Sequence, residues 1–211
     1  MSDAPHAEPE AFAAGDTLAR QILAELAPLV FREAADEPER DAAFRLRYRA
    51  LAEMGLDAAE ACPDGRECDE FDASAVQVLG FEGRTLVATC RLVLPSPGRR
   101  LPMQAAYALP FEAVTDVVEW GRVVVDPAYR GDGHSVFMGL AACGWLSLRA
   151  RGFSRAIAAT PKRLVSLFDA IGFAATIVGE ARVYWGEERY PILCEGRASI
   201  PGLRQHLDPA E

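Results

Sequence analysis

The chain has 211 residues and a mass of 22.9 kDa, half of its residues are apolar or aromatic, and its formal charge is −9. These values favour one folded domain with a sizeable core, and they exclude a disordered tail and a small disulfide scaffold. The acidic balance argues against nucleic acid or an anionic membrane as the main partner, because both need a basic face.

The five cysteines are scattered, and none of them forms a C-x-x-C pair. This pattern indicates reduced thiols and no structural zinc site. No secretory leader pattern is present at the start, and no apolar run is long enough to cross a membrane. We therefore expect a cytoplasmic bacterial protein with no metal and no membrane span.

The N-terminal part predicts an arm, two helices and a loop. Residues 1–15, rich in Ala, Pro and Glu, are expected to form a flexible arm. Asp16 is expected to cap a helix over 17–26, and Asp36, with Glu39 three residues later, a second helix that ends near Met54. A short strand at 29–32 and a long loop at 56–72 complete this part.

The remainder alternates strands and helices without an internal repeat. Residues 117–125 are strongly β-prone, and a glycine-rich turn leads from them into a helix that starts near His134 and ends at Gly152. The other expected elements are strands at 74–81, 85–94, 155–160, 174–178 and 182–194, and a helix from Pro161 to Gly172. The pattern predicts one α/β (α+β) domain over 16–200 with a mostly antiparallel twisted sheet flanked by helices, and a tail at 201–211.

The unit of strand, glycine turn and helix is a candidate phosphate site. The start of a helix presents free N–H groups and a positive dipole end, and glycines let a ligand approach the backbone closely. The turn lacks the Gly-Lys-Ser/Thr of a Walker loop and the spacing of a dinucleotide fingerprint. An ordinary strand-to-helix turn is the alternative.

This turn resembles motif A of the GNAT acyltransferases, R/Q-x-x-G-x-G/A, with Arg130, Gly133 and Ser135 at its defined positions. The resemblance implies the GNAT fold and a loop that holds the pyrophosphate of coenzyme A or the phosphopantetheine of an acyl carrier protein. The residues implied in this contact are Val123, Val125, Arg130, Gly131, Asp132, Gly133, His134 and Ser135. Phe168 stands where many acetyltransferases carry a tyrosine that protonates the leaving thiolate.

A second, narrower resemblance is to the acyl-homoserine lactone synthases and the related N-acyl amino acid synthases. It rests on spaced motifs between about residues 40 and 175, in order Arg45-Leu-Arg47-Tyr48, Glu67-Cys-Asp69-Glu-Phe-Asp72, Cys90-Arg91-Leu92 and Glu119-Trp-Gly-Arg122. Leu51 and Gly55-Leu56 depart from the aromatic residues that help form the S-adenosylmethionine region in the lactone synthases. The departure favours another amine acceptor.

The residues themselves support part of this interpretation. Arg47 lies on the apolar stripe of its helix, and a buried guanidinium needs carboxylate partners. The residues expected to bind the acceptor are Arg47, Glu67, Asp69, Asp72 and Arg91. Two interpretations of these charged residues are possible. They form a structural ion-pair network that holds the long loop, or they form a polar floor that also receives the acceptor's amine and carboxylate.

Glu119 and Arg122 would point to opposite faces of a regular strand. A β-bulge at Gly121 would bring both toward one site, and GNAT proteins carry a bulge on this strand. Glu119 is then the expected general base. The other expected catalytic residues are Arg122 and Val124, with backbone N–H groups from Val123 to Val125 stabilising the oxyanion.

The predicted activity is the transfer of an acyl group from a thioester of coenzyme A or acyl carrier protein to the amine of a small, amino-acid-like acceptor. An arginine patch is one place where a carrier protein could dock, formed by Arg99, Arg100, Arg149 and Arg151. The alternatives are a short-chain acetyltransferase that uses acetyl-CoA and a non-catalytic domain that binds or senses acyl thioesters.

Overall fold

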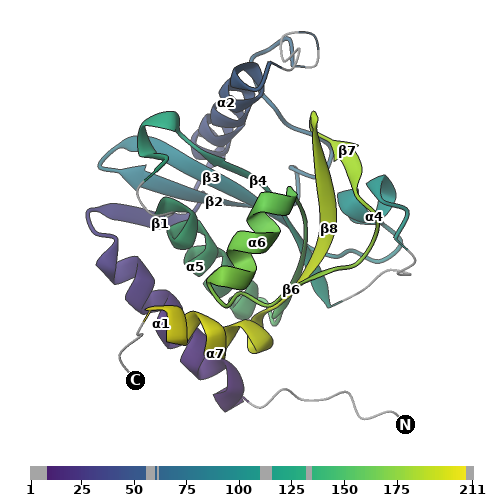
Figure 1. Cartoon of the computed structure of the whole chain (residues 1–211). Coiled ribbons are helices and arrows are strands. Elements are labelled where there is room, and N and C mark those ends of the chain that lie inside the picture. Colours follow the sequence, from purple (N-terminus) through teal and green to yellow (C-terminus); the bar gives the residue numbers. More distant parts are fainter. Residues whose placement is uncertain (1–8, 56–59, 61, 110–115, 132–134, 208–211) are drawn as a thin grey trace.

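A computed structural model describes residues 9–55, 60, 62–109, 116–131 and 135–207 of the chain (Figure 1). Eight strands form one open sheet in the order β1-β2-β3-β4-β5-β8-β6, with β7 paired to β8. The pairings are antiparallel except between β4 and β5. The predicted mixed, mostly antiparallel sheet is confirmed.

The first strands and the second helix form as the sequence predicts. β1 covers Leu29–Glu33, α2 Glu37–Glu53, β2 Val76–Glu82 and β3 Thr85–Val93. The Asp36 carboxylate caps α2 by accepting the Glu39 N–H at 3.0 Å. A two-residue turn joins Glu82 to Thr85, and Gly83 adopts the positive φ of 58° that such a turn requires.

The central unit also follows the prediction, with one addition. β4 covers Val117–Val125, a single 3₁₀ turn Pro127–Tyr129, and α5 Ser135–Ala150. The addition is the short helix α4, Pro102–Ala106, inside a segment with little periodicity. Its buried residues pack under β4 and β5.

The C-terminal strands differ from the prediction at one point. β5 covers Arg155–Thr160, α6 Lys162–Ala170 and β6 Ala175–Ile177. The expected strand at 182–194 is a hairpin of β7, Arg182–Tyr184, and β8, Glu187–Glu195. Trp185 and Gly186 form its turn with φ angles of 56° and 71°. Asn, Asp or Gly usually occupies the first position of such a turn, so a tryptophan there does not predict one.

The prediction of a flexible arm and a tail is wrong for the described residues at the two ends of the chain. α1 covers Pro9–Glu25 and α7 covers Gly196–Leu207, so residues 9–15 and 201–207 are helical and are not an arm and a tail. Asp16 lies inside α1 and accepts a hydrogen bond from Trp145 Nε1 at 2.8 Å. α1 begins earlier because Phe12, only 3% exposed, packs against Trp145 and Arg149 of α5, far away in the sequence. Residues 1–8 and 208–211 lie outside the described part, and the division into arm, domain and tail is otherwise still a prediction.

The helices cover the sheet from both sides (Figure 1). α5 and α6 pack on one face, with α1 and α7 against the outer side of α5 and the lower end of the sheet. α2 and α4 lie on the other face, where Arg91 and Val93 of β3 point. β4 is therefore central in the sheet and has a helix layer on each side.

Candidate active site

The sheet splits between β4 and β5. The two strands pair only from Val117 opposite Arg155 to Glu119 opposite Ile157. β5 continues to Thr160 in register with β8, while β4 continues to Val125 in register with β3. From Gly121 onward β4 therefore has one edge without a strand partner, and the gap opens toward the start of α5.

A β-bulge lies on β4 beside this split. Gly121 is opposite Arg91 and Val124 is opposite Thr89, so Arg122 and Val123 together face the single residue Cys90. Arg122 adopts a φ of 53°, which is unusual for a residue with a side chain. The predicted bulge is present, one residue beyond Gly121, and it turns both Glu119 and Arg122 toward one cavity.

Hydrogen bonding after the bulge follows the strand alternation. The Asp126 N–H donates to the Val87 carbonyl at 2.8 Å. This bond shows which residues of β4 direct their backbone groups toward β3. Val124, two residues earlier, directs its N–H toward β3, whereas the N–H and C=O of Val125 point away from β3, toward the split. In agreement, the Val125 carbonyl accepts a hydrogen bond from Arg130 Nε at 2.7 Å.

A cavity of about 100 Å³ occupies the split. One wall is β4 from Glu119 to Val124, and another is the end of α2 with Leu51 and Met54. The remaining lining residues are Arg47, Ala50, Glu67, Met103, Ala159, Tyr184, Trp185 and Arg189. Of the predicted site residues, the cavity thus receives Glu119, Arg122, Val123, Val124, Arg47 and Glu67.

Glu119 is buried and accepts a backbone hydrogen bond. Its side chain is 3% exposed, and its Oε2 accepts the backbone N–H of Met103 at 2.7 Å. Oε1 points the other way, 3.9 Å from where a Cβ on Gly121 would lie. Burial raises the pKa of Glu119 to about 7, although the Met103 N–H and the neighbouring arginines act in the opposite direction.

The five predicted acceptor-binding residues form one buried network. Arg47 donates two parallel hydrogen bonds to Asp72, both 2.9 Å, and a third to Glu67. Arg91 Nη1 donates to Asp69 at 2.6 Å and to Asp72 at 2.9 Å. Although burial acts to raise the pKa of Asp72, the bonds from Arg47 hold it well below its ordinary value. Asp69, Asp72 and Arg91 do not line the cavity.

Arg122 connects this network to the bulge. Its Nε donates to Glu67 at 3.0 Å and its Nη2 to Asp69 at 2.9 Å. Its guanidinium carbon also lies 4.3 Å from the ring centre of Trp185, at the tip of the β7–β8 hairpin. Three guanidinium groups thus meet three carboxylates, and Glu119 stands outside these pairs.

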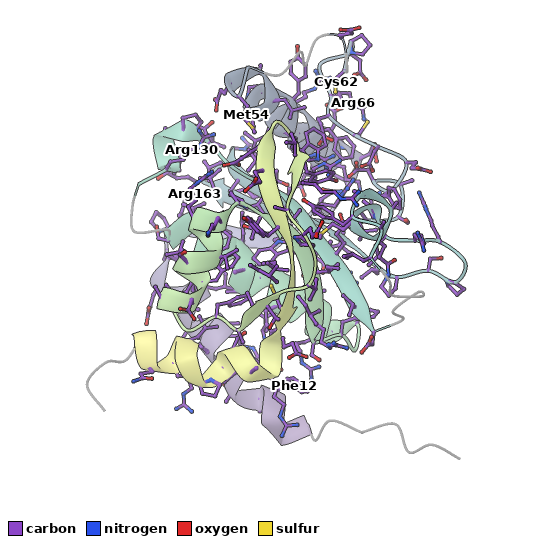
Figure 2. The ribbon with its side chains drawn as sticks, turned by 45° about the vertical axis from the view of Figure 1, so that its right-hand side comes forward. Phe12, Met54, Cys62, Arg66, Arg130 and Arg163 are labelled. Carbon is purple, nitrogen blue, oxygen red and sulfur yellow. The ribbon has the colours of Figure 1, made fainter. Side chains whose placement is uncertain are left out.

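The candidate phosphate site is described in part. Asp126 caps the 3₁₀ turn through the Ala128 N–H at 3.1 Å, and Gly131 has a φ of 110°. Arg130 Nη2 forms an ion pair with Glu53 at 2.9 Å, which joins the turn to the end of α2, and Arg130 and Met54 lie at the same end of the molecule in Figure 2. Ser135 is the first residue of α5. Asp132, Gly133 and His134 lie outside the described residues.

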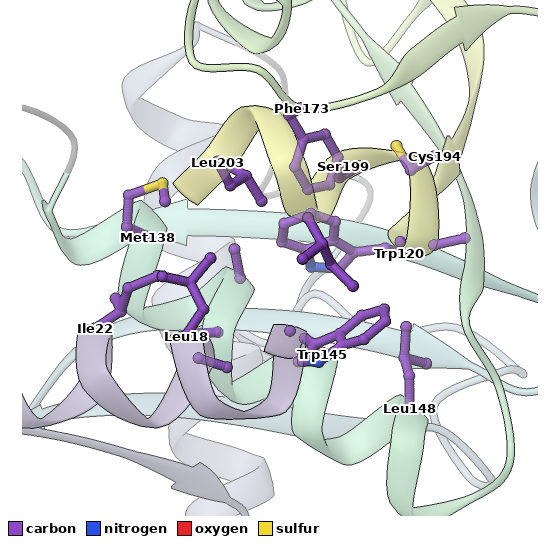
Figure 3. Close-up of a pocket in the computed structure, with 18 of the residues that line it drawn as sticks. Leu18, Ile22, Trp120, Met138, Trp145, Leu148, Phe173, Cys194, Ser199 and Leu203 are labelled. Atoms are coloured by element: carbon purple, nitrogen blue, oxygen red, sulfur yellow. The ribbon is translucent and has the colours of Figure 1, made fainter. Parts of the chain in front are cut away.

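A second, apolar cavity of about 100 Å³ lies on the face of the sheet that α5 covers (Figure 3). Trp120 of β4 lines both cavities. Strands and helices from both ends of the chain surround it, and Figure 3 shows Leu18 and Ile22 of α1, Met138 and Trp145 of α5, and Leu203 of α7 on its walls. Its surface is almost entirely hydrocarbon, which suits an alkyl chain and not a charged group.

The sequence model of one family, described as N-acyl amino acid synthase FeeM, matches residues 42–192. The chain belongs to this family. The match spans the α2 network, the split strand and the β7–β8 hairpin, and it contains every predicted site residue. This FeeM-type protein is an N-acyltransferase, which confirms the predicted reaction class and leaves the non-catalytic alternative without support.

Solved structures show the same fold. The acyl-homoserine lactone synthase LasI has a TM-score of 0.65 at 16% identity, with 82% of this chain and 95% of that chain covered. BjaI, a CoA-dependent acyl-homoserine lactone synthase solved with SAM and isopentyl-CoA, has a TM-score of 0.64 at 24% identity over 79% and 81% of the two chains. FeeM from uncultured soil microbes has a TM-score of 0.59 at 18% identity over 84% and 94%. No curated protein matches the chain in sequence.

The structure adds site residues that the sequence did not indicate. Met103 orients Glu119 through a backbone N–H, which no side-chain pattern can reveal. Tyr184, Trp185 and Arg189 reach the cavity because the hairpin folds over it. The run of aromatic residues at 184–190 was the available signal, and it predicts sheet surface as readily as a cavity wall.

Two absences apply to the described part of the FeeM-type chain. It contains no group of three side chains placed to ligate a metal. None of its described helices combines the length and the apolar character that a membrane crossing needs. Arg149 and Arg151 of the predicted arginine patch face Asp16 and Glu33, so their charges are compensated locally.

Proposed function

We propose that the protein transfers a fatty acyl group from a thioester of coenzyme A or acyl carrier protein to the α-amine of a small acceptor, at the split between β4 and β5. The observation that carries the proposal is the position of Glu119. A buried carboxylate with a pKa of about 7 faces a polar cavity, and its neighbour Trp120 also lines an apolar one.

The thioester would lie along the free edge of β4. The phosphate groups would meet the N–H groups of residues 130–135 at the start of α5, as the GNAT resemblance implies. The amides of the pantetheine arm would pair with the open edge from Val123 to Val125, in the manner of an added strand. Arg130 would exchange Glu53 for a phosphate, because a dianion competes well for a half-exposed guanidinium.

The acyl chain would enter the apolar cavity past Trp120. A chain of several methylene groups is stabilised there by about 0.8 kcal/mol for each CH₂ removed from water. An acetyl group would leave the cavity unused, so its presence favours a fatty acyl donor over acetyl-CoA. BjaI, which shares the fold, is described as CoA-dependent, and this supports coenzyme A as one carrier.

The chemical step follows from the placement of Glu119. The acceptor amine gives a proton to Oε1, and its nitrogen attacks the thioester carbonyl carbon. Backbone N–H groups at the bulge and at Val125 would stabilise the oxyanion; Val124 would hold the strand, since its own N–H points to β3. The C–N bond forms, the C–S bond breaks, and the thiolate takes up the proton that Glu119 releases. Phe168 is buried and has no hydroxyl with which to supply that proton.

The buried network would position the acceptor side of the cavity. Arg47, Glu67 and Arg122 reach the cavity and would form its polar floor, whereas Asp69, Asp72 and Arg91 would hold them in place from behind. Both readings of the network thus apply, each to a different part of it. Leu51 at the acceptor wall removes an aromatic residue expected for S-adenosylmethionine, which favours another amine.

The test is the Glu119→Gln variant, assayed for amide product with a fatty acyl-CoA and a mixture of amino acids. We expect turnover to fall by roughly two to four powers of ten, on the usual scale of a general base. Binding of the acyl-CoA should be unchanged, because Glu119 does not touch the phosphate groups. The exposed Glu195→Gln variant is the matched control. Wild-type turnover in Glu119→Gln would remove Glu119 from this role.

A further inference from the structure

The cavity wall across the split from Glu119 carries Arg189. This residue lies on β8, one position before Tyr190, which pairs with Thr160 at the end of β5. Glu119 and Arg189 line the same cavity of about 100 Å³. In a space this small, a ligand that reaches one of the two side chains is within reach of the other.

The guanidinium of Arg189 is incompletely paired. Its Nε is buried and meets no hydrogen-bond acceptor within the described residues. Its ion contact with Glu187 is long, at 3.6 Å, and Glu187 also accepts a hydrogen bond from Arg163. Burial lowers the pKa of Arg189, which reports a cation with too little compensation.

The other two arginines of the cavity differ from Arg189. Arg47 uses its Nε and both terminal nitrogens on Glu67, Asp72 and Gln77. Arg122 is held by Glu67 and Asp69. Of the three cavity arginines, Arg189 therefore has the most donor capacity left for a ligand.

The backbone holds Arg189 firmly in this position. Arg189 pairs with Arg182 across the β7–β8 hairpin. Its carbonyl also accepts a hydrogen bond from the buried Tyr107 hydroxyl at 3.1 Å. The fixed backbone keeps the Arg189 side chain at the cavity, and a carboxylate matches the fork of N–H groups of a guanidinium.

The anion that fits here belongs to the acceptor, since the phosphate groups of the thioester would lie at the start of α5. We propose that Arg189 determines the specificity for the acceptor by binding its α-carboxylate, which turns the acceptor amine toward Glu119. This inference rests on the proposed function. The surrounding walls of Leu51, Met54, Tyr184 and Trp185 are apolar or aromatic, and they suit an apolar acceptor side chain.

The first measurement compares acceptors in the wild-type protein. L-Phenylalanine and L-leucine are offered with a fatty acyl-CoA beside two series of analogues, their decarboxylated amines and their carboxamides, and the other amino acids are offered in parallel. Mass spectrometry then quantifies the amide products. We expect the free amino acids to be preferred over both analogues by roughly 10- to 100-fold in kcat/KM, the scale of a hydrogen bond to a charged group.

The second measurement uses Arg189→Met and Arg189→Lys. Arg189→Met should raise the KM of the amino acid and so remove the preference for free amino acids over their analogues. The KM of the acyl-CoA should be unchanged. Arg189→Lys should keep part of it, because it retains the charge and loses the fork. Arg182→Met is the matched control, since Arg182 is exposed and lies opposite Arg189 in the hairpin but does not line the cavity. The comparison between proteins cancels differences in amine basicity, and melting curves establish that each variant is folded.

The outcomes separate the two proposals. If the wild-type protein acylates none of the amines or amino acids, the proposed function is wrong. If it acylates the decarboxylated amines as well as the amino acids, the carboxylate anchor alone is overturned. A folded Arg189→Met variant that keeps the wild-type preference overturns it equally.

Discussion

Glu119 and Asp72 are both buried carboxylates in the same site, and their pKa values move in opposite directions. Burial raises the pKa of Glu119 to about 7, and among the described residues only the Met103 N–H binds it directly. Burial also acts to raise the pKa of Asp72, but Arg47 and Arg91 bind it directly and hold the value low. The number of guanidinium partners decides which carboxylate is a fixed anion and which can exchange a proton.

A pH prediction follows for Glu119. Since the base works only when deprotonated, kcat/KM should fall as the pH drops through about 7. This pH dependence should disappear in Glu119→Gln.

The same shift predicts an effect on stability. The pKa of Glu119 is higher in the folded protein than in the unfolded chain, so the folded state loses stability as the pH rises from the unfolded pKa to the folded pKa. At pH 8 Glu119→Gln should therefore raise the free energy of unfolding by up to roughly 3 kcal/mol, and at pH 4 by little. Chemical denaturation at both pH values measures this, and equal effects at the two would contradict the shifted pKa.

At the scale of elements, one helix residue holds the loop that follows α2. Arg47 projects from α2 onto Glu67 and Asp72, and Glu67 in turn donates its N–H to the Phe44 carbonyl at 3.0 Å. The turns from residue 62 to 75 contain no strand or long helix, so their order depends on these contacts. The same contacts place Glu67 below Arg122, which joins the loop to the bulge on β4.

We predict that Arg47→Met lowers the free energy of unfolding by roughly 3–5 kcal/mol, because it removes one of the guanidinium groups that compensate the buried carboxylates Glu67 and Asp72. Limited proteolysis within residues 62–75 should accelerate, and turnover should fall. Arg45→Met on the same helix is the control: its ion pair with Asp41 is exposed, and its loss should cost about 0.5 kcal/mol or less. Equal stability of the two variants would show that the network does not hold the loop.

At the scale of the molecule, the apolar cavity joins helices from both ends of the chain. α1 and α7 close it on the side away from the split, and α5 forms its long wall. Gly144 of α5 lines it, and a Cβ built there meets no atom within 4 Å. The Cβ of a side chain at this position therefore has open space, and a longer side chain would extend into the cavity.

We predict that Gly144→Leu shifts the preferred donor toward shorter acyl chains, measured with a series from butyryl-CoA to palmitoyl-CoA. Gly144→Ala should be folded and more stable by up to about 1 kcal/mol, since alanine favours a helix interior. Gly139 on the same helix is the contrast, because a Cβ there would lie 2.3 Å from the Phe31 ring, so Gly139→Ala should destabilise the protein. An unchanged chain-length profile in Gly144→Leu would place the acyl chain elsewhere.

Much of the fold could be predicted because its signals are local. The Asp36 cap, the Gly83 turn and the run of β-branched residues at 117–125 each depend on neighbours within a few residues. The spaced motifs also located Glu119, Arg122 and the buried network. The bulge could be anticipated from the need to place Glu119 and Arg122 on one side.

The amino-acid sequence by itself determined most of the strands and helices, and its spaced motifs indicated the reaction class and most of the charged residues of the candidate site. Only the tertiary structure decided that residues 9–15 and 201–207 are helical, that Met103 orients Glu119, and that Arg189 reaches the same cavity. The physical reason is distance along the chain. Periodicity and turn chemistry are set by adjacent residues, whereas the partner of a backbone N–H or of a guanidinium is chosen by packing between elements that lie far apart in the sequence.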